Sequence, residues 1–111
     1  MDLKEEVVGE VTVLEVKGRV DSNTAPALGE RLTMLFATPS QRLVLDMRNL
    51  EYISSAGFRV LLLAARRAEE VTGRLVLCGL SGKVQQLFDL GGFLDLFAIS
   101  ASRDEAVTVA R

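Results

Sequence analysis

The feature that most constrains the fold is the alternation of short apolar runs with stretches in which apolar residues recur at helical spacing. The β-branched run Val11–Val16 comes first, and the later runs are Arg42–Met47, Arg74–Cys78 and Leu96–Ile99. Strands that alternate with helices form mostly parallel sheets, because each helix carries the chain back to the start of the next strand. We therefore expect one α/β domain over residues 1–111. Its mixed, mostly parallel sheet should have about five strands, with about four helices, in the order β-β-α-β-α-β-α-β-α.

The N-terminal segment predicts a hairpin followed by a helix. Gly9-Glu10 separates Val7–Val8 from Val11–Val16, and a glycine at the first central position suits a two-residue turn. Four residues that favour helix N-termini follow, and Pro26 stands where a first helical turn tolerates it. The expected helix ends at Thr38-Pro39-Ser40. The four capping candidates are Asp21, Ser22, Asn23 and Thr24, and the apolar residues at helical spacing are Leu28, Leu32, Leu35 and Phe36.

Two serines mark the start of a second predicted helix. Ser54 and Ser55 follow the apolar stretch Leu50–Ile53, and helical spacing then runs over Gly57–Val71. Serine is among the best residues at a helix N-cap, so the first interpretation is that one of the two only caps this helix. The predicted buried face of this helix comprises Phe58, Leu61, Leu62, Ala65 and Ala68.

The C-terminal third predicts two further helices around a last strand. Ser81 is placed to cap a short helix, which Gly91-Gly92 interrupts before the strand Leu96–Ile99. Ser102 is followed three residues later by Glu105, the spacing of a capping box, which predicts a terminal helix.

The composition excludes several kinds of function. The chain has no histidine, which removes histidine nucleophile triads and histidine metal ligands. Its net charge is −2 and no basic run is present, so nucleic acid is not an expected partner. The single cysteine, Cys78, lies inside an apolar run and is expected to be a buried, inert thiol.

No cofactor or metal site is expected. The segment Gly79–Lys83, GLSGK, lacks the spacing of a phosphate-binding loop, because Leu77 and Val84 stand where that motif requires a glycine and a hydroxyl residue. Asp21, Asp46 and Glu51 are not spaced as a ligand set. The sequence therefore does not predict an enzyme.

The sequence also predicts no direct insertion into a membrane. The N-terminus is charged, and the apolar segment Val60–Ala65 is far shorter than the roughly 20 residues that span a bilayer. A cytoplasmic setting is the expectation.

A second interpretation of the serine pair is chemical. A hydroxyl at a strand–turn–helix junction lies near free N–H groups and the positive end of the helix dipole, where a phosphoryl group is well tolerated. A phosphoserine adds nearly two negative charges without unfolding the domain, so it can change what a surface binds. With no base nearby in the sequence, the serine is interpreted as a phosphate acceptor for another protein's kinase activity.

Three segments together resemble the STAS domain of the anti-sigma-factor antagonist family, over nearly the whole chain. GRVDSNTAPAL, residues 18–28, resembles the family's approach to its first helix, and YISSAGFRVLL is the most specific piece. GLSGKVQQLFDLGGFLDLFAIS resembles the third helix and last strand.

The resemblance implies a partner switch without a cofactor. In this family the unmodified antagonist binds an anti-sigma factor that is also a serine kinase, which frees the sigma factor. Phosphorylation of one serine blocks that binding, and a PP2C-type serine phosphatase reverses it. The family's acceptor falls on Ser55, with Ser54 as the second choice, and Asp21 matches an acidic residue beside the acceptor.

The expected partner-binding surface comprises Asp21, Ser22, Asn23, Thr24, Ser54, Ser55, Ala56, Gly57 and Arg59. The alternative is a STAS-like accessory subunit of a transporter or larger signalling complex, in which the serine is only a cap.

Overall fold

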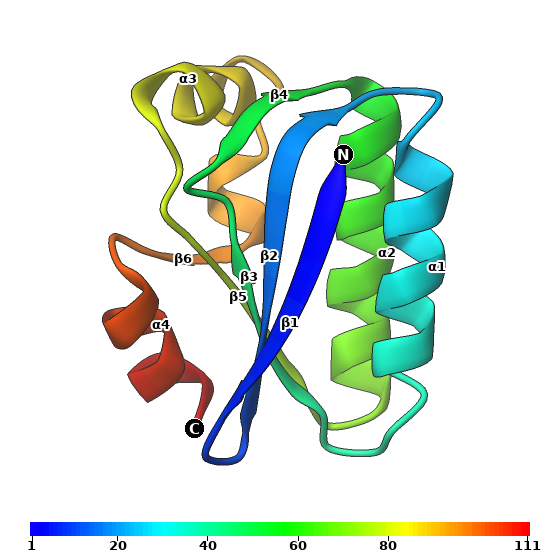
Figure 1. The fold of residues 1–111 in the computed structure, drawn as a ribbon, viewed down its shortest axis with the longest axis vertical. Coiled ribbons are helices and arrows are strands. Elements are labelled where there is room, and N and C mark those ends of the chain that lie inside the picture. The colour runs from blue at the N-terminus through cyan, green and yellow to red at the C-terminus, as the bar shows by residue number, and fades with distance from the viewer.

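A computed structural model describes all residues 1–111 and contains a six-stranded sheet with four α-helices (Figure 1). The strand order is β1-β2-β3-β5-β6, and β4 pairs with the far end of β2. Only β1 runs antiparallel, against β2, as the expected N-terminal hairpin. The strands are β1 Asp2–Val8, β2 Val11–Val20, β3 Arg42–Asp46, β4 Leu50–Ile53, β5 Arg74–Cys78 and β6 Ala98–Ser100. The mostly parallel α/β architecture is confirmed.

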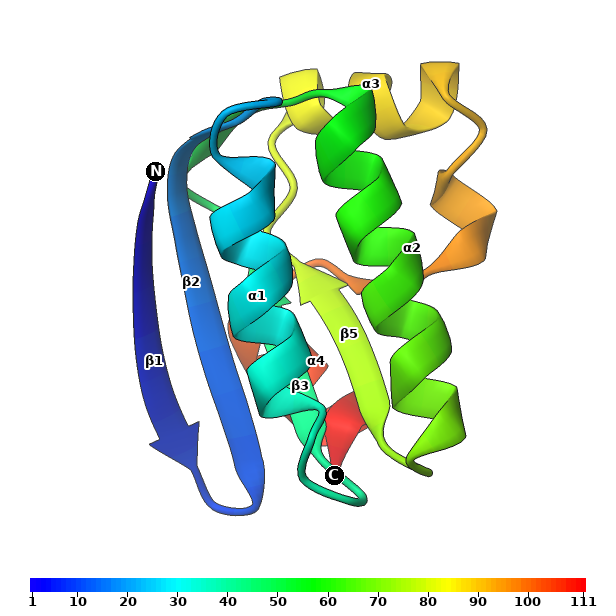
Figure 2. The ribbon, with the colours of Figure 1, turned by 90° about the vertical axis from the view of Figure 1, so that its right-hand side faces the viewer.

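The helices form layers around the sheet. Figure 2 shows α1 (Ala25–Leu35) and α2 (Ser55–Glu70) side by side on one face. The last helix, α4 (Arg103–Ala110), covers the opposite face, where it packs on β2, β3 and β5. The remaining helix, α3 (Gly82–Leu90), packs against β4 at one end of the sheet. No helix combines the length and the apolar character that crossing a bilayer requires.

Two features of the strand pattern differ from the sequence prediction. The stretch Leu50–Ile53 is itself a strand, β4, which pairs with β2 beyond a register shift between Gly18 and Arg19. The predicted strand Leu96–Ile99 is wrong at its start, because Leu94–Leu96 form a 3₁₀ turn and β6 begins at Ala98. This turn lets Phe93 stack on Phe58 while Phe97 reaches Phe88, so ring packing overrides the local strand pattern.

Two helix boundaries also differ. The first helix ends at Leu35, short of the predicted stop at Thr38–Ser40. The second begins at Ser55, two residues before the predicted start at Gly57. Phe58, Leu61 and Ala68 are buried as predicted, whereas Ala64 takes the buried place expected for Leu62 and Ala65, which are half-buried.

The core is divided by the sheet. The larger cluster lies between the sheet and α1, α2 and α3, and includes Leu14, Leu28, Leu45, Leu61 and Phe88. The smaller cluster lies under α4, where Ala106, Val107 and Ala110 cover a valine-rich face. Burial of apolar surface in these two clusters contributes about 25 cal/mol per Å² and is the main force that holds the helices in place.

Polar contacts fix both ends of α4. At its start, Arg103 donates through Nε to Oδ2 of Asp46 at 2.9 Å and through Nη1 to Glu6 at 2.8 Å. At its end, Arg42 and Arg74 donate to the carbonyl oxygens of Ala110 and Val109. Asp46 is the one charged residue that is buried. The contacts with Arg103 therefore also give its carboxylate the hydrogen bonds and counter-charge that it needs in the interior.

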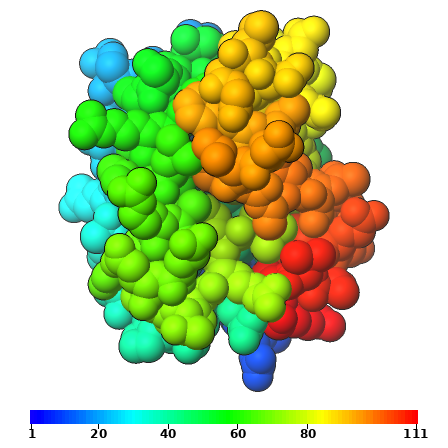
Figure 3. All heavy atoms as spheres, turned by 180° about the vertical axis from the view of Figure 1, so that it is seen from behind, coloured from blue at the N-terminus to red at the C-terminus, as the bar shows by residue number.

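The edge strand β6 covers only the second half of β5. Figure 3 shows the hollow that remains between α2, β6 and α4, and its volume is about 380 Å³. Most of its lining residues are apolar, including Ala68, Leu75, Phe97 and Val109.

Candidate functional site

The junction between β4 and α2 gives the two serines different environments. Ser54 is the N-cap of α2, and its Oγ accepts a hydrogen bond from the Gly57 N–H at 3.4 Å. Its own N–H donates to the Val20 carbonyl at 2.8 Å, and its carbonyl accepts from Phe58. The half-buried Ser54 is therefore the capping serine of the pair.

Ser55 is the first residue of α2 and is exposed. Its hydroxyl makes no hydrogen bond, unlike that of Ser54. The side chain lines a surface hollow of about 490 Å³ at the N-terminal ends of α1 and α2, together with Ser22, Ala25, Pro26, Ala56, Arg59 and Val60. We call this region the Ser55 hollow. A hydroxyl in this position is open to another protein.

The loop between β2 and α1 forms the other wall of this region and is held by Asp21. The Asp21 carboxylate accepts from the N–H of Asn23 at 2.9 Å and of Thr24 at 3.1 Å. These two hydrogen bonds hold the pKa of Asp21 below its usual value, and the bond from Asn23 has the larger effect. No hydrogen bond joins Asp21 to Ser55, so its role in the structure is to shape the loop.

None of the four predicted capping residues caps α1 with its side chain. Thr24 occupies the N-cap position, but its hydroxyl donates to the Arg19 carbonyl and accepts from the Asp21 N–H, both at 2.9 Å. The loop is therefore tied to the end of β2, which places Ser22 beside the start of α2.

Gly57 is buried and serves the core. A Cβ there would lie 2.6 Å from Cγ1 of Ile53 and 2.8 Å from Cγ1 of Val20, so only glycine lets α2 start this close to β2 and β4. Its place is under the surface, so it does not face a partner directly, although it was expected in the partner-binding surface.

The structure brings several of the predicted surface residues together. Ser22, Ser55, Ala56 and Arg59 line the same hollow, with Asn23 exposed on the adjoining loop. The lining residues that sequence reasoning missed are Ala25, Pro26 and Val60. Val60 follows Ala56 by four residues on α2, the spacing at which helical neighbours meet, so this signal could have found Val60. Ser22 precedes α1, so no helical spacing indicates Ala25 or Pro26.

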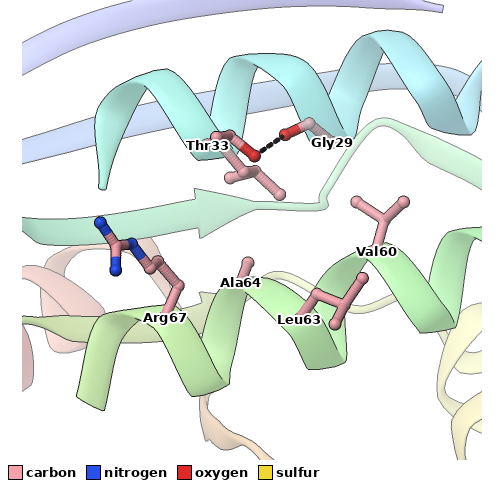
Figure 4. A pocket seen from close by; sticks show the side chains of 7 residues that line it. Gly29, Thr33, Val60, Leu63, Ala64 and Arg67 are labelled. Carbon is pink, nitrogen blue, oxygen red and sulfur yellow. Dashed lines mark hydrogen bonds between the residues drawn. The ribbon is translucent and has the colours of Figure 1, made fainter. Parts of the chain in front are cut away.

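A second, smaller hollow continues along the two helices. Figure 4 shows it between α1 and α2, where Gly29, Thr33, Val60, Leu63, Ala64 and Arg67 line about 140 Å³. Val60 lines both hollows, so they share one wall. The helices approach closely here, because a Cβ on Gly29 would be 3.3 Å from Val60.

The other candidate groups do not form a site. Cys78 is buried, which together with the nearby Asp46 charge raises the pKa of its thiol to about 11, so the predicted buried thiol is confirmed. Ser81 accepts from the Val84 N–H at 3.2 Å as the predicted cap of α3. No group of three or more carboxylate or thiol side chains is arranged to hold a metal ion.

Comparison with known proteins agrees with this fold. The sequence pattern of the STAS domain matches residues 3–106. The protein BtrV of Bordetella bronchiseptica, which carries the name of an anti-sigma factor antagonist, is 42% identical over 91 residues, covering 82% of this chain and 78% of its own. The anti-sigma-B factor antagonist of Bacillus subtilis is 30% identical over 94 residues, or 85% of each chain.

A solved structure matches as well. The crystal structure of an anti-sigma factor antagonist from Mycobacterium paratuberculosis superposes with a TM-score of 0.88 at 26% identity, covering 99% of this chain and 93% of that one. The sheet order and helix layers of this chain are those of a STAS domain. The chain belongs to the STAS domain family and, within it, to the anti-sigma-factor antagonists.

Proposed function

We propose that this protein is an anti-sigma-factor antagonist that works by partner switching, with Ser55 as its phosphate acceptor. In the unmodified state it binds an anti-sigma factor that is also a serine kinase, and so releases the sigma factor. The named relatives support the class of regulator. The observation that carries the proposal is the exposed, unbonded hydroxyl of Ser55 beside the Ser54 hydroxyl, which accepts the capping bond of α2.

The chemistry is supplied by the partners. In the kinase complex the Ser55 Oγ attacks the γ-phosphorus of ATP, the bond to the β,γ-bridging oxygen breaks, and ADP leaves. The hydroxyl proton passes to a base on the kinase. A PP2C-type serine phosphatase directs water onto the phosphorus and regenerates the serine hydroxyl with release of inorganic phosphate. The chain itself acts as a substrate and binding module, without a cofactor of its own.

The location of Ser55 explains how a phosphate would block docking. A partner that covers the Ser55 hollow removes it from water, and taking a phosphate out of water costs several kcal/mol even where a cation lies near it. A micromolar complex has only about 8 kcal/mol of binding free energy, so this cost is decisive. The fold is unaffected because the Ser55 side chain makes no bond that phosphorylation would break.

The partner-binding surface is proposed to centre on Ser22, Asn23, Ser55, Ala56 and Arg59. Ser54, Asp21 and Thr24 support it from half-buried positions, and Gly57 supports it from the core. The molecule is proposed to work in the cytoplasm, where such partners are found.

Incubation of the purified chain with its kinase partner and ATP, followed by peptide mass mapping, tests the acceptor. We expect one phosphate on Ser55 in the parent and in Ser54→Ala, and none in Ser55→Ala. Ser55→Ala should bind the kinase at least as tightly as the parent and Ser55→Asp at least about tenfold more weakly, a change of about 1.4 kcal/mol.

The matched Ser54→Ala variant separates the role of helix cap from the role of phosphate acceptor. It should lose on the order of 1 kcal/mol of folding free energy, because the cap of α2 is removed, while it keeps the phosphate acceptor. Phosphate on Ser54 would refute the assignment of the acceptor. Co-purification with a transporter or a large ATP-hydrolysing assembly, and with no small kinase, would favour an accessory-subunit role instead.

A further inference from the structure

The guanidinium of Arg59 has no partner in the structure. Arg59 is exposed, makes no hydrogen bond or salt bridge, and is the only charged residue that lines the Ser55 hollow. Arg31 on α1 pairs with Glu5, and Arg67 on α2 pairs with Glu70, whereas Arg66, outside the hollow, is unpaired like Arg59. The hollow therefore holds one unneutralised positive charge.

Arg59 and Ser55 are also neighbours by helix geometry. They are four residues apart on α2, a spacing that places the Cβ atoms roughly 5–6 Å apart on one face. Helical side chains lean towards the helix N-terminus, so the long Arg59 side chain extends in the direction of Ser55. A phosphate on the Ser55 oxygen would come within reach of its N–H donors.

No carboxylate competes for this position. The first turns of α1 and α2 contain no acidic residue. Asp21, on the loop beside the hollow, is occupied by the backbone N–H groups of Asn23 and Thr24. Glu51 on β4 and Arg19 on β2 also lie towards this end of the molecule, but neither lines the hollow, and Arg19 stacks on Tyr52 at 4.4 Å.

We infer that Arg59 is the internal counter-ion of the phosphate on Ser55, an inference that rests on the proposed function. The guanidinium and the phosphate form charge-assisted hydrogen bonds within one helix face. The lining of the Ser55 hollow then changes from about +1 to a net charge of about −1, because a phosphoserine carries roughly −1.5 to −2. Phosphorylation thus both adds negative charge and takes the one free cation of the hollow away from a partner.

The test uses phosphoserine installed at position 55 during translation, so that no kinase is needed. The pKa of its second ionisation is followed by ³¹P NMR titration at low salt, in the parent and in Arg59→Gln. The parent pKa should lie about 0.5 unit or more below that of Arg59→Gln, in which the helix N-terminus remains and only the guanidinium is lost. The difference should shrink in about 1 M salt, because the pair is exposed.

Arg66→Gln is the matched control. Arg66 lies on the same helix, is exposed and has no ion pair, so its loss should leave the phosphoserine pKa as in the parent. Unmodified Arg59→Gln should melt within about 2 °C of the parent, which shows that the variant folds.

Equal phosphoserine pKa values in the parent and Arg59→Gln would overturn the inference. A rise of this pKa in Arg66→Gln as large as that in Arg59→Gln would also overturn it. Either result would leave the proposed function standing. Conversely, a kinase that fails to modify Ser55 would defeat the proposed function while the counter-ion measurement remains valid.

Discussion

Two consecutive serines divide two tasks between them at the start of α2. Ser54 closes the helix through the Gly57 N–H, and Ser55 presents its hydroxyl to solvent. The two tasks conflict for a single side chain, because a hydroxyl that accepts a capping bond is held against the helix end. The pair therefore lets the helix stay capped whether or not the second hydroxyl is modified.

Gly57 fixes the position of that helix end, and its replacement should show it. In Gly57→Ala the new Cβ would overlap Ile53 and Val20, while the gain in helix propensity offsets part of the strain. We expect a net loss of about 1–2 kcal/mol in the free energy of unfolding, measured by urea denaturation.

The control for this substitution is Gly82→Ala at the first position of α3. A Cβ at Gly82 meets nothing within 4 Å, so this variant should be as stable as the parent or slightly more stable. Equal stabilities of the two variants would contradict the close packing of α2 on β2 and β4.

At the scale of elements, the sequence predicted correctly those strand and helix limits that depend on local interactions. Arg74–Cys78 has the predicted strand limits, and Ser102 accepts from the Glu105 N–H at 3.2 Å at the predicted start of α4. The strand Leu50–Ile53 was missed because it is only four residues long and pairs with β2 beyond a register shift. A strand this short is not distinguished from a loop by an alternating apolar pattern.

The same limit applies to the candidate site. Sequence reasoning placed a serine at a helix start, but both serines suited a cap equally well. A helix that begins at Ser55 makes Ser54 the cap and leaves Ser55 outside, whereas the predicted start at Gly57 did not distinguish them. That difference depends on how Gly57 packs on Val20 and Ile53, which is tertiary information.

Arg103 makes the charged attachment at the start of α4. It satisfies Asp46, whose side chain is only 3% exposed, and without it the buried carboxylate keeps only the Arg48 guanidinium at 4.0 Å as a counter-charge. Arg103→Gln should therefore lower the free energy of unfolding by about 2 kcal/mol, and amide exchange should accelerate first in α4.

The double variant Asp46→Asn with Arg103→Gln is the comparison that isolates the pair. It should be more stable than Arg103→Gln alone, because no unpaired charge remains in the interior. A single variant with parental stability and unchanged exchange in α4 would show that the apolar contacts of α4 alone hold this helix.

At the scale of the whole molecule, the candidate site and α4 lie on different layers. The Ser55 hollow is formed by the starts of α1 and α2, on the face of the sheet opposite α4 (Figures 1 and 2). Neither core cluster includes Ser55, and the Ser55 hydroxyl makes no hydrogen bond. The scaffold can therefore stay constant while the surface charge changes.

The most direct test of the account is a calorimetric titration of the kinase partner into two forms of the chain, one unmodified and one with phosphoserine at position 55. The account predicts binding weaker by at least about tenfold for the modified form, at unchanged secondary structure and melting temperature within about 2 °C. Equal affinities for the two forms, or a loss of binding that accompanies unfolding, would contradict it.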